Sequence, residues 1–99
     1  MDWIEIIQLK SFTGRDRDSA VAAFGELSAP SSDVGLREID LLKNPKLENE
    51  LNILINWYGE MPSNGKSGLG LQLARAFSEF GYIDHSGWRH SCRLAHEAS

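Results

Sequence analysis

The sequence has one cysteine, Cys92, among 99 residues, and it has no long run of apolar residues. A single cysteine cannot form a disulfide within the chain, so no disulfide framework is expected. No apolar stretch approaches the roughly 20 residues that cross a bilayer as a helix. The start, Met1 to Glu5, lacks the basic and apolar regions of a secretory signal. These absences give no support to a membrane role, and the expected location is the cytoplasm.

Positive charge is also scarce. The chain has 10 Lys and Arg against 14 Asp and Glu, for a net charge of −4. Affinity for nucleic acid comes mostly from Lys and Arg that neutralise phosphates, so no nucleic-acid partner is expected. With 41% hydrophobic and 24% charged residues, the composition is that of a folded globular protein. The length predicts a single α+β domain over residues 1–99 with one core.

Four segments rich in β-branched and aromatic residues are predicted to be strands. They are 3–12, 34–42, 50–58 and 82–90. Residues 43–49 contain an Asn-Pro pair typical of a hairpin connection, so the second and third strands are predicted to pair antiparallel. In the first strand Ile4 and Ile6 fall in one phase, while Ile7 and Leu9 fall in the other. Apolar residues in both phases are typical of a strand that is covered on both faces.

Two segments with apolar residues at helical spacing are predicted to be helices. The first covers roughly 16–27 and is ended by 28–33, where proline and small polar residues favour a turn. The second has Ser67 as its cap, and Gly81 is the C′ residue that follows its end. Its apolar stripe is Leu69, Leu73, Phe77 and Phe80. The order is βαββαβ, with a core over about 3–90, two helices on one face of a four-stranded antiparallel sheet, and a C-terminal tail at 91–99.

The segment from Gly59 to Ser67 follows a strand, opens a helix and ends in Gly-Lys-Ser, as a phosphate-binding P-loop does. Five residues rather than four separate Gly59 from Gly65, and Pro62 removes one backbone N–H that a phosphate would need. The favoured interpretation is a loop that leads to a helix cap. The alternative is a weak anion site at this helix start, assisted by Lys66.

Metal-ligand residue types occur near the C-terminus, at His85, His90, Cys92 and His96. Their spacing matches no zinc pattern, and on a strand His85 and His90 point to opposite faces. No metal site is therefore predicted. The carboxylates of Glu38 and Asp40 share one strand face and need only be solvated.

Aromatic residues gather at two places. Trp57 ends the third strand, and Trp88 lies beside His85 and His90 in the fourth. Tryptophan lines pockets and interfaces as readily as cores. Because His85 and His90 lie near Trp88 in the sequence, a pocket or a subunit interface is favoured near Trp57 and Trp88.

The element order, together with the local run Trp57-Tyr58-Gly59-Glu60, resembles the ferredoxin-like dimeric α+β barrel superfamily. Its best-known members are antibiotic-biosynthesis and quinol monooxygenases. The resemblance implies two protomers whose sheets form a shared barrel, with helices outside and a hydrophobic pocket between each sheet and its helices. A homodimer is also expected from the strand phases, because helices on one face leave the other face of the sheet uncovered.

What the resemblance implies about activity leads to two hypotheses. Several members are cofactor-free oxygenases of aromatic or quinol substrates, and others degrade haem with an Asn, Trp and His set. Of that set only Trp57 has a counterpart here, since the first strand has no Asn and the second helix has no His. The first hypothesis is a cofactor-free oxygenase with His85, or alternatively His90, as proton acceptor, a choice made from residue type. The residues expected to bind a small hydrophobic or aromatic ligand are Asn56, Trp57, Trp88 and His90.

The second hypothesis is a non-catalytic dimeric module that binds a ligand or a partner. Here Trp88 and the mixed strand faces serve the subunit interface. Neither hypothesis requires a cofactor.

Overall fold

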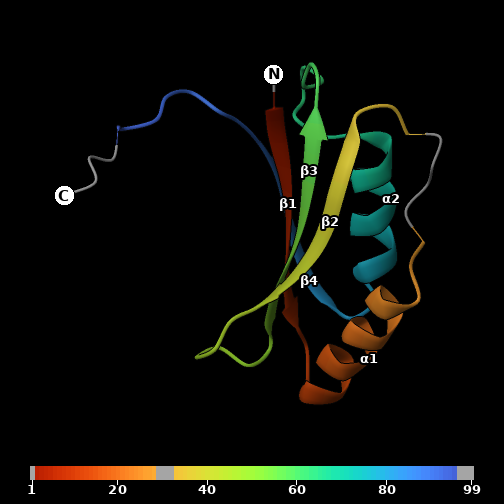
Figure 1. Ribbon diagram of the computed structural model, residues 1–99. Helices are drawn as coiled ribbons and strands as arrows, with labels where there is room; N and C mark the ends of the chain where they lie inside the picture. Colours follow the sequence, from red (N-terminus) through yellow and green to blue (C-terminus); the bar gives the residue numbers. More distant parts are fainter. Residues whose placement is uncertain (1, 29–32, 96–99) are drawn as a thin grey trace.

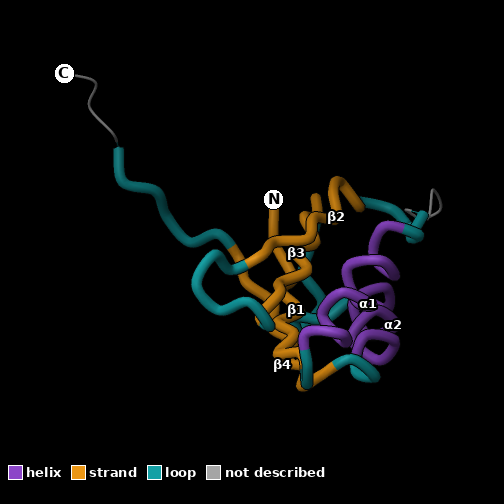
Figure 2. Tube along the Cα trace, turned by 90° about the horizontal axis from the view of Figure 1, so that it is seen from below, coloured by secondary structure: helices purple, strands orange, loops and turns teal. Residues whose placement is uncertain are grey.

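A computed structural model of the chain describes residues 2–28 and 33–95. The elements follow the predicted order: β1 (Asp2–Ser11), α1 (Gly14–Gly25), β2 (Leu36–Lys43), β3 (Glu50–Tyr58), α2 (Gly68–Phe77) and β4 (Gly81–Arg89). The strands form one antiparallel sheet in the order β2-β3-β1-β4. Both helices pack against the same face of the sheet (Figures 1 and 2). The predicted ferredoxin-like α+β fold is confirmed.

The face beneath the helices, called here the helix face, holds the core. Alternate residues of β1 and β3 point into it and are buried together with residues of both helices. Its fully buried or nearly buried apolar members are Trp3, Ile7, Leu9, Ala20, Leu51, Ile53, Ile55, Trp57, Leu73 and Phe77. The phase of β3 predicted to be apolar is therefore the phase that the helices cover. One charged residue, Glu5, is buried among these side chains.

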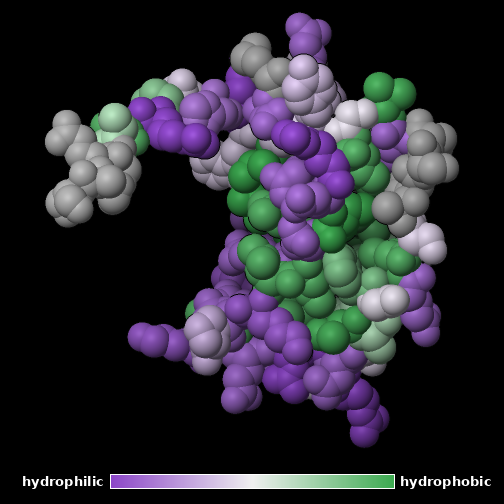
Figure 3. Space-filling view, in the orientation of Figure 1, coloured by the Kyte–Doolittle hydropathy of each residue, from purple (hydrophilic) through white to green (hydrophobic). Residues whose placement is uncertain are grey.

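The opposite face, called here the open face, carries the even-numbered residues of β1 and the residues paired with them. Ile4 lies opposite Asn56 and Trp88, and Ile6 lies opposite Leu54 and Ser86. The β2–β3 hairpin and the segment after β4 both extend to this side of the sheet (Figure 1). Between them the surface is hollowed (Figure 3). No helix of the described residues is long and apolar enough to cross a membrane.

The element ends differ from the predictions by a few residues. Helix α1 begins earlier than predicted, because Thr13 is its cap and accepts a hydrogen bond from the Asp16 backbone N–H. The predicted cap Ser67 of α2 is confirmed, but Gly81 as its C′ residue is wrong, because the C-cap is Ser78. The helix ends at Phe77, and Gly81 begins β4. A Cβ at Gly81 would lie 2.1 Å from the Lys10 carbonyl oxygen, so close packing against β1 requires this glycine.

The connections fit the predictions where the structure describes them. In the β2–β3 hairpin the Asn44 side chain accepts hydrogen bonds from the backbone N–H groups of Lys46 and Leu47. Residues 90–95 follow β4 without helix or strand. Part of the predicted 28–33 turn, at 29–32, and the end of the predicted tail, at 96–99 with His96, lie outside the described residues.

Candidate functional site

Glu5 lies in β1 with its side chain on the helix face and is fully buried, at 0% exposed. Its oxygen Oε1 accepts hydrogen bonds from Trp57 Nε1, at 2.7 Å, and from the Ser67 hydroxyl. Its oxygen Oε2 accepts from the Ser67 backbone N–H, at 3.1 Å, and lies 2.7 Å from His85 Nε2. The carboxylate thus joins β1, β3, β4 and the start of α2. These four residues, Glu5, Trp57, Ser67 and His85, are called here the Glu5 cluster.

The strand register explains how two of these residues reach Glu5. Glu5 lies opposite Ile55 in β3 and Gly87 in β4. Trp57 is two residues beyond Ile55, and His85 is two residues before Gly87. Because side chains alternate along a strand, both project onto the same face as Glu5. The register of the strands therefore determines which side chains contact Glu5.

The loop between β3 and α2 supplies the remaining contacts. It is the near P-loop segment, and its Ser67 caps α2 by accepting a hydrogen bond from the Gly70 N–H at 2.9 Å. The interpretation as a loop leading to a helix cap is confirmed. The Ser67 N–H, which an external anion at this helix start would need, is bound to Glu5. The positive end of the helix dipole therefore faces the protein's own carboxylate.

Glycines make room for this arrangement at two places. A Cβ on Gly70, in the first turn of α2, would lie 1.9 Å from Glu5 Oε2. Gly65, with a φ of +70°, lies against Gly87 of β4, where a Cβ on Gly87 would lie 2.0 Å from the Gly65 carbonyl oxygen. The helix and the loop therefore close over the cluster only because these positions have no side chain.

The contacts of Glu5 also define the state of His85. A carboxylate only accepts hydrogen bonds, so Nε2 of His85 donates to Glu5 and carries the proton. In that tautomer Nδ1 is the ring nitrogen without a hydrogen. With 6% of its side chain exposed, His85 is shielded from bulk water. The contact with Glu5 therefore holds the imidazole ring in one orientation in a buried setting.

The residues predicted to form the site fall into two groups. Trp57 and His85 meet at Glu5, and Trp57 also stacks on Trp3 with ring centroids 5.6 Å apart. Asn56 projects to the open face opposite Ile4 and lines a cavity of about 330 Å³ that Trp57 also lines. Trp88 and His90 are likewise separate from the Glu5 cluster.

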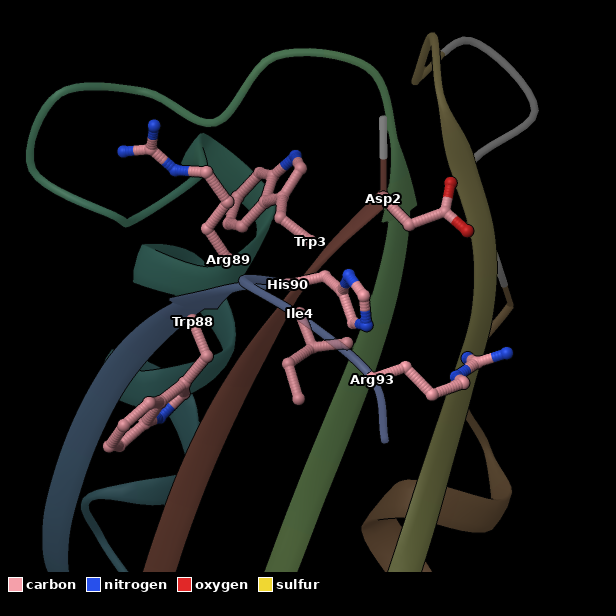
Figure 4. A pocket seen from close by; sticks show the side chains of 7 residues that line it. All are labelled: Asp2, Trp3, Ile4, Trp88, Arg89, His90 and Arg93. Atoms are coloured by element: carbon pink, nitrogen blue, oxygen red, sulfur yellow. The ribbon is translucent and has the colours of Figure 1, made fainter. Parts of the chain in front are cut away.

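Trp88 and His90 line a larger cavity of about 510 Å³, where β1 begins and β4 ends, called here the end cavity (Figure 4). Its lining residues are Asp2, Trp3, Ile4, Trp88, Arg89, His90 and Arg93. Within residues 2–28 and 33–95, no group of three or more His, Cys, Asp or Glu could hold a metal ion.

Two members of the Glu5 cluster were missed by sequence reasoning, Glu5 and Ser67 in its role as a Glu5 ligand. A signal for Glu5 exists in β1. It lies in the same phase as Trp3, Ile7 and Leu9, which are all apolar. A lone carboxylate in an apolar phase has to be buried with partners or else disrupt the strand, so this position could have been singled out.

No family model matches the sequence, and no curated protein matches it. Several solved structures share the fold. The protein Rv0793 of Mycobacterium tuberculosis is 14% identical with a TM-score of 0.67, covering 96% of this chain and 100% of that one. A dimeric ferredoxin-like protein from an uncultured marine organism is 10% identical with a TM-score of 0.63, covering 97% and 93%. SnoaB of Streptomyces nogalater, described as a cofactor-independent oxygenase, is 12% identical with a TM-score of 0.57, covering 96% and 98%.

At these identities the likeness shows the fold. The predicted resemblance to ferredoxin-like proteins with monooxygenase members is confirmed at that level.

Proposed function

We propose that the protein is a homodimeric, cofactor-independent oxygenase that acts on an electron-rich phenol or hydroquinone, with His85 as general base. The observation that carries the proposal is the 2.7 Å contact between His85 Nε2 and the buried Glu5 carboxylate. It leaves Nδ1 as the proton acceptor in a site with little water. The fold likeness to SnoaB is consistent with this reaction class but assigns no residue.

The proposed reaction needs only the substrate and dioxygen. His85 Nδ1 removes a proton from the substrate, and the resulting anion forms a bond from a ring carbon to O₂. The distal oxygen takes the proton back from His85, giving a hydroperoxide on a carbon that still carries one hydrogen. Loss of water from that carbon leaves a carbonyl. One oxygen atom thus replaces two hydrogens of the substrate, and the other oxygen leaves as water.

The proposed entrance is a cavity of about 220 Å³ below the loop after β3, lined in part by Trp3, Glu60 and Met61. Trp3 forms a wall of this cavity and stacks on Trp57, whose N–H contacts Glu5. An aromatic substrate that enters here would pack against Trp3, which stacks on Trp57 of the Glu5 cluster. In this proposal Trp57 contacts the substrate, in addition to holding Glu5.

The homodimer is proposed to form through the open face. Large apolar side chains lie on it without cover from the chain's own helices, including Tyr58 and Tyr82, which are 63% and 72% exposed. Exposed apolar surface of this extent marks an interaction site, and a second copy presents the same surface. One structural neighbour is described as dimeric. A monomer in sedimentation at micromolar concentration would contradict this part of the proposal.

The enzymatic part is tested by oxygen consumption with hydroquinone-type substrates such as 1,4-naphthalenediol. The variant His85→Gln should lose activity by about two to four orders of magnitude, the usual contribution of a general base. His90→Gln is the matched control, because it removes a histidine that does not contact Glu5. Activity retained in His85→Gln, or no oxygen uptake by the unaltered protein, would exclude this function.

A non-catalytic ligand-binding module is the second candidate. The observation that favours it is that four contacts of the buried Glu5 carboxylate are made with groups of this chain, as in a structural cluster. Here the Glu5 cluster holds β1, β4 and α2 together. Ligands that raise the melting temperature without oxygen uptake would favour this candidate over the oxygenase.

A further inference from the structure

We propose that the end cavity is a second ligand site, separate from the Glu5 cluster, and that it binds a planar aromatic carboxylate. The cavity lies where β1 begins and β4 ends, and its volume of about 510 Å³ is within the range of small-molecule sites. The proposal does not depend on the oxygenase chemistry, because the residues that line this cavity are not members of the Glu5 cluster.

The apolar part of the cavity suits a flat ring. Ile4 and Trp88 are register partners on the open face, so their side chains lie next to each other there. The Trp88 indole Nε1 donates to Ser86 Oγ at 2.9 Å, which restrains the ring. An aromatic ligand can pack against this pair and cover apolar surface that is otherwise exposed to water.

The charged part of the cavity suits an anion. Arg89, His90 and Arg93 line it, in a chain whose net charge is −4. Its one acidic lining residue, Asp2, is paired with Arg37 at 2.9 Å. Within the described part of the chain, Arg89 and Arg93 form no ion pair with an acidic residue, unlike Arg17 and Arg37. Their guanidinium groups are therefore free to bind a carboxylate.

The arrangement separates these two parts. In Figure 4, Trp88 lies to the left of Ile4, His90 and Arg93 lie to its right, and Arg89 lies beside Trp3. A ring against Ile4 and Trp88 thus directs its carboxylate toward Arg93 and His90. Arg89 adds positive charge from the far side of the strand end. A neutral aromatic would use the apolar wall but not these cations.

The test uses 2-naphthoate as the ligand probe and 2-naphthol as its uncharged counterpart. The three tryptophans give three indole N–H signals in a ¹⁵N-labelled sample. Naphthoate should shift the Trp88 signal in a saturable manner, and naphthol should bind about tenfold more weakly, the effect of one lost charged interaction. The Trp57 signal reports on the Glu5 cluster. A shift of the Trp57 signal without a shift of the Trp88 signal would show that naphthoate binds at the Glu5 cluster instead.

Arginine variants test which positive charges bind the carboxylate. Arg89→Gln with Arg93→Gln should weaken naphthoate binding by about tenfold or more and leave naphthol binding unchanged. Arg15→Gln, which removes an exposed arginine of α1 far from the cavity in sequence, should change neither. Arg89→Lys with Arg93→Lys keeps both positive charges and should retain part of the affinity for naphthoate. That result would show that the Gln variant loses binding through its charge and not through misfolding.

The proposal is overturned by any of three results: no Trp88 shift at millimolar naphthoate, equal binding of naphthol, or full binding by the Gln double variant. A failure of the oxygenase proposal would instead appear as unchanged oxygen uptake in His85→Gln. The two sets of experiments therefore fail independently.

Discussion

The two faces of the sheet keep their polar groups in different states. On the helix face the carboxylate of Glu5 is fully buried, and every donor it accepts from belongs to this chain. On the open face Tyr58, Tyr82 and Trp88 are exposed, and Arg93, in the segment after β4, has no acidic partner among the described residues. The Glu5 cluster is complete as folded, whereas the open face is the surface on which a ligand and a second copy are proposed to bind.

The largest expected effect comes from removing the carboxylate of the Glu5 cluster. Glu5→Ala leaves the donors of Trp57, Ser67 and His85 buried without an acceptor, and breaking such a buried network costs about 3–5 kcal/mol. Total stability of a domain is typically about 5–15 kcal/mol, so urea denaturation should show a marginally stable protein. Glu38→Ala, an exposed carboxylate of β2, should change stability by less than about 0.5 kcal/mol. Equal effects of the two variants would mean that Glu5 has no structural role.

The next effect comes from the glycine that gives Glu5 its space. Gly70→Ala places a methyl group against Glu5 Oε2 and should destabilise the protein by about 1–3 kcal/mol, despite the better helix propensity of alanine. Gly68→Ala lies in the same turn of α2 with no atom within 4 Å of the new methyl group. It should be neutral or stabilising by up to about 1 kcal/mol. Opposite signs in thermal denaturation would establish the close approach, and matching signs would refute it.

A smaller effect is expected from deleting one donor while keeping an aromatic ring. Trp57→Phe removes the N–H that reaches Glu5 at 2.7 Å and should cost about 1–3 kcal/mol, the penalty for a buried group left short of a partner. Trp88→Phe removes an N–H bonded to Ser86 in an exposed pair on the open face, and should cost less than about 0.5 kcal/mol. Comparable losses in urea denaturation would mean that the two faces do not differ in this way.

How far the sequence predicts this molecule also differs between its faces. The alternating residues of 50–58 identify β3 and its covered phase, because a half-apolar strand has one arrangement that buries its apolar side chains. The Glu5 cluster could not be assembled in the same way. Trp57, Ser67 and His85 lie 52, 62 and 80 residues from Glu5 along the chain. Their meeting depends on strand order and register, which residue spacing within one segment does not contain.

Alternation along the strands explains why the predicted site residues lie on different faces of the sheet. Asn56 and Trp57 are neighbours in sequence, yet alternation sends their side chains to opposite faces. His85 and Trp88 differ by an odd number of residues in β4 and separate for the same reason. Assigning these histidine and tryptophan residues to a common site requires the face on which each one lies.

The smallest effect on the stability of the protomer is expected on the open face, where assembly should respond instead. Ile6→Lys places a charge at the middle of β1, opposite Leu54 and Ser86, and the side chain can extend into water in a free protomer. In a dimer that closes over this face the charge would be buried without a partner, so sedimentation should show monomers. Leu71→Lys makes the same kind of change on the exposed side of α2 and should leave the dimer intact. A dimer that persists in Ile6→Lys would move the interface away from the open face, and the hollow between the hairpin and the segment after β4 would then be left for ligands alone.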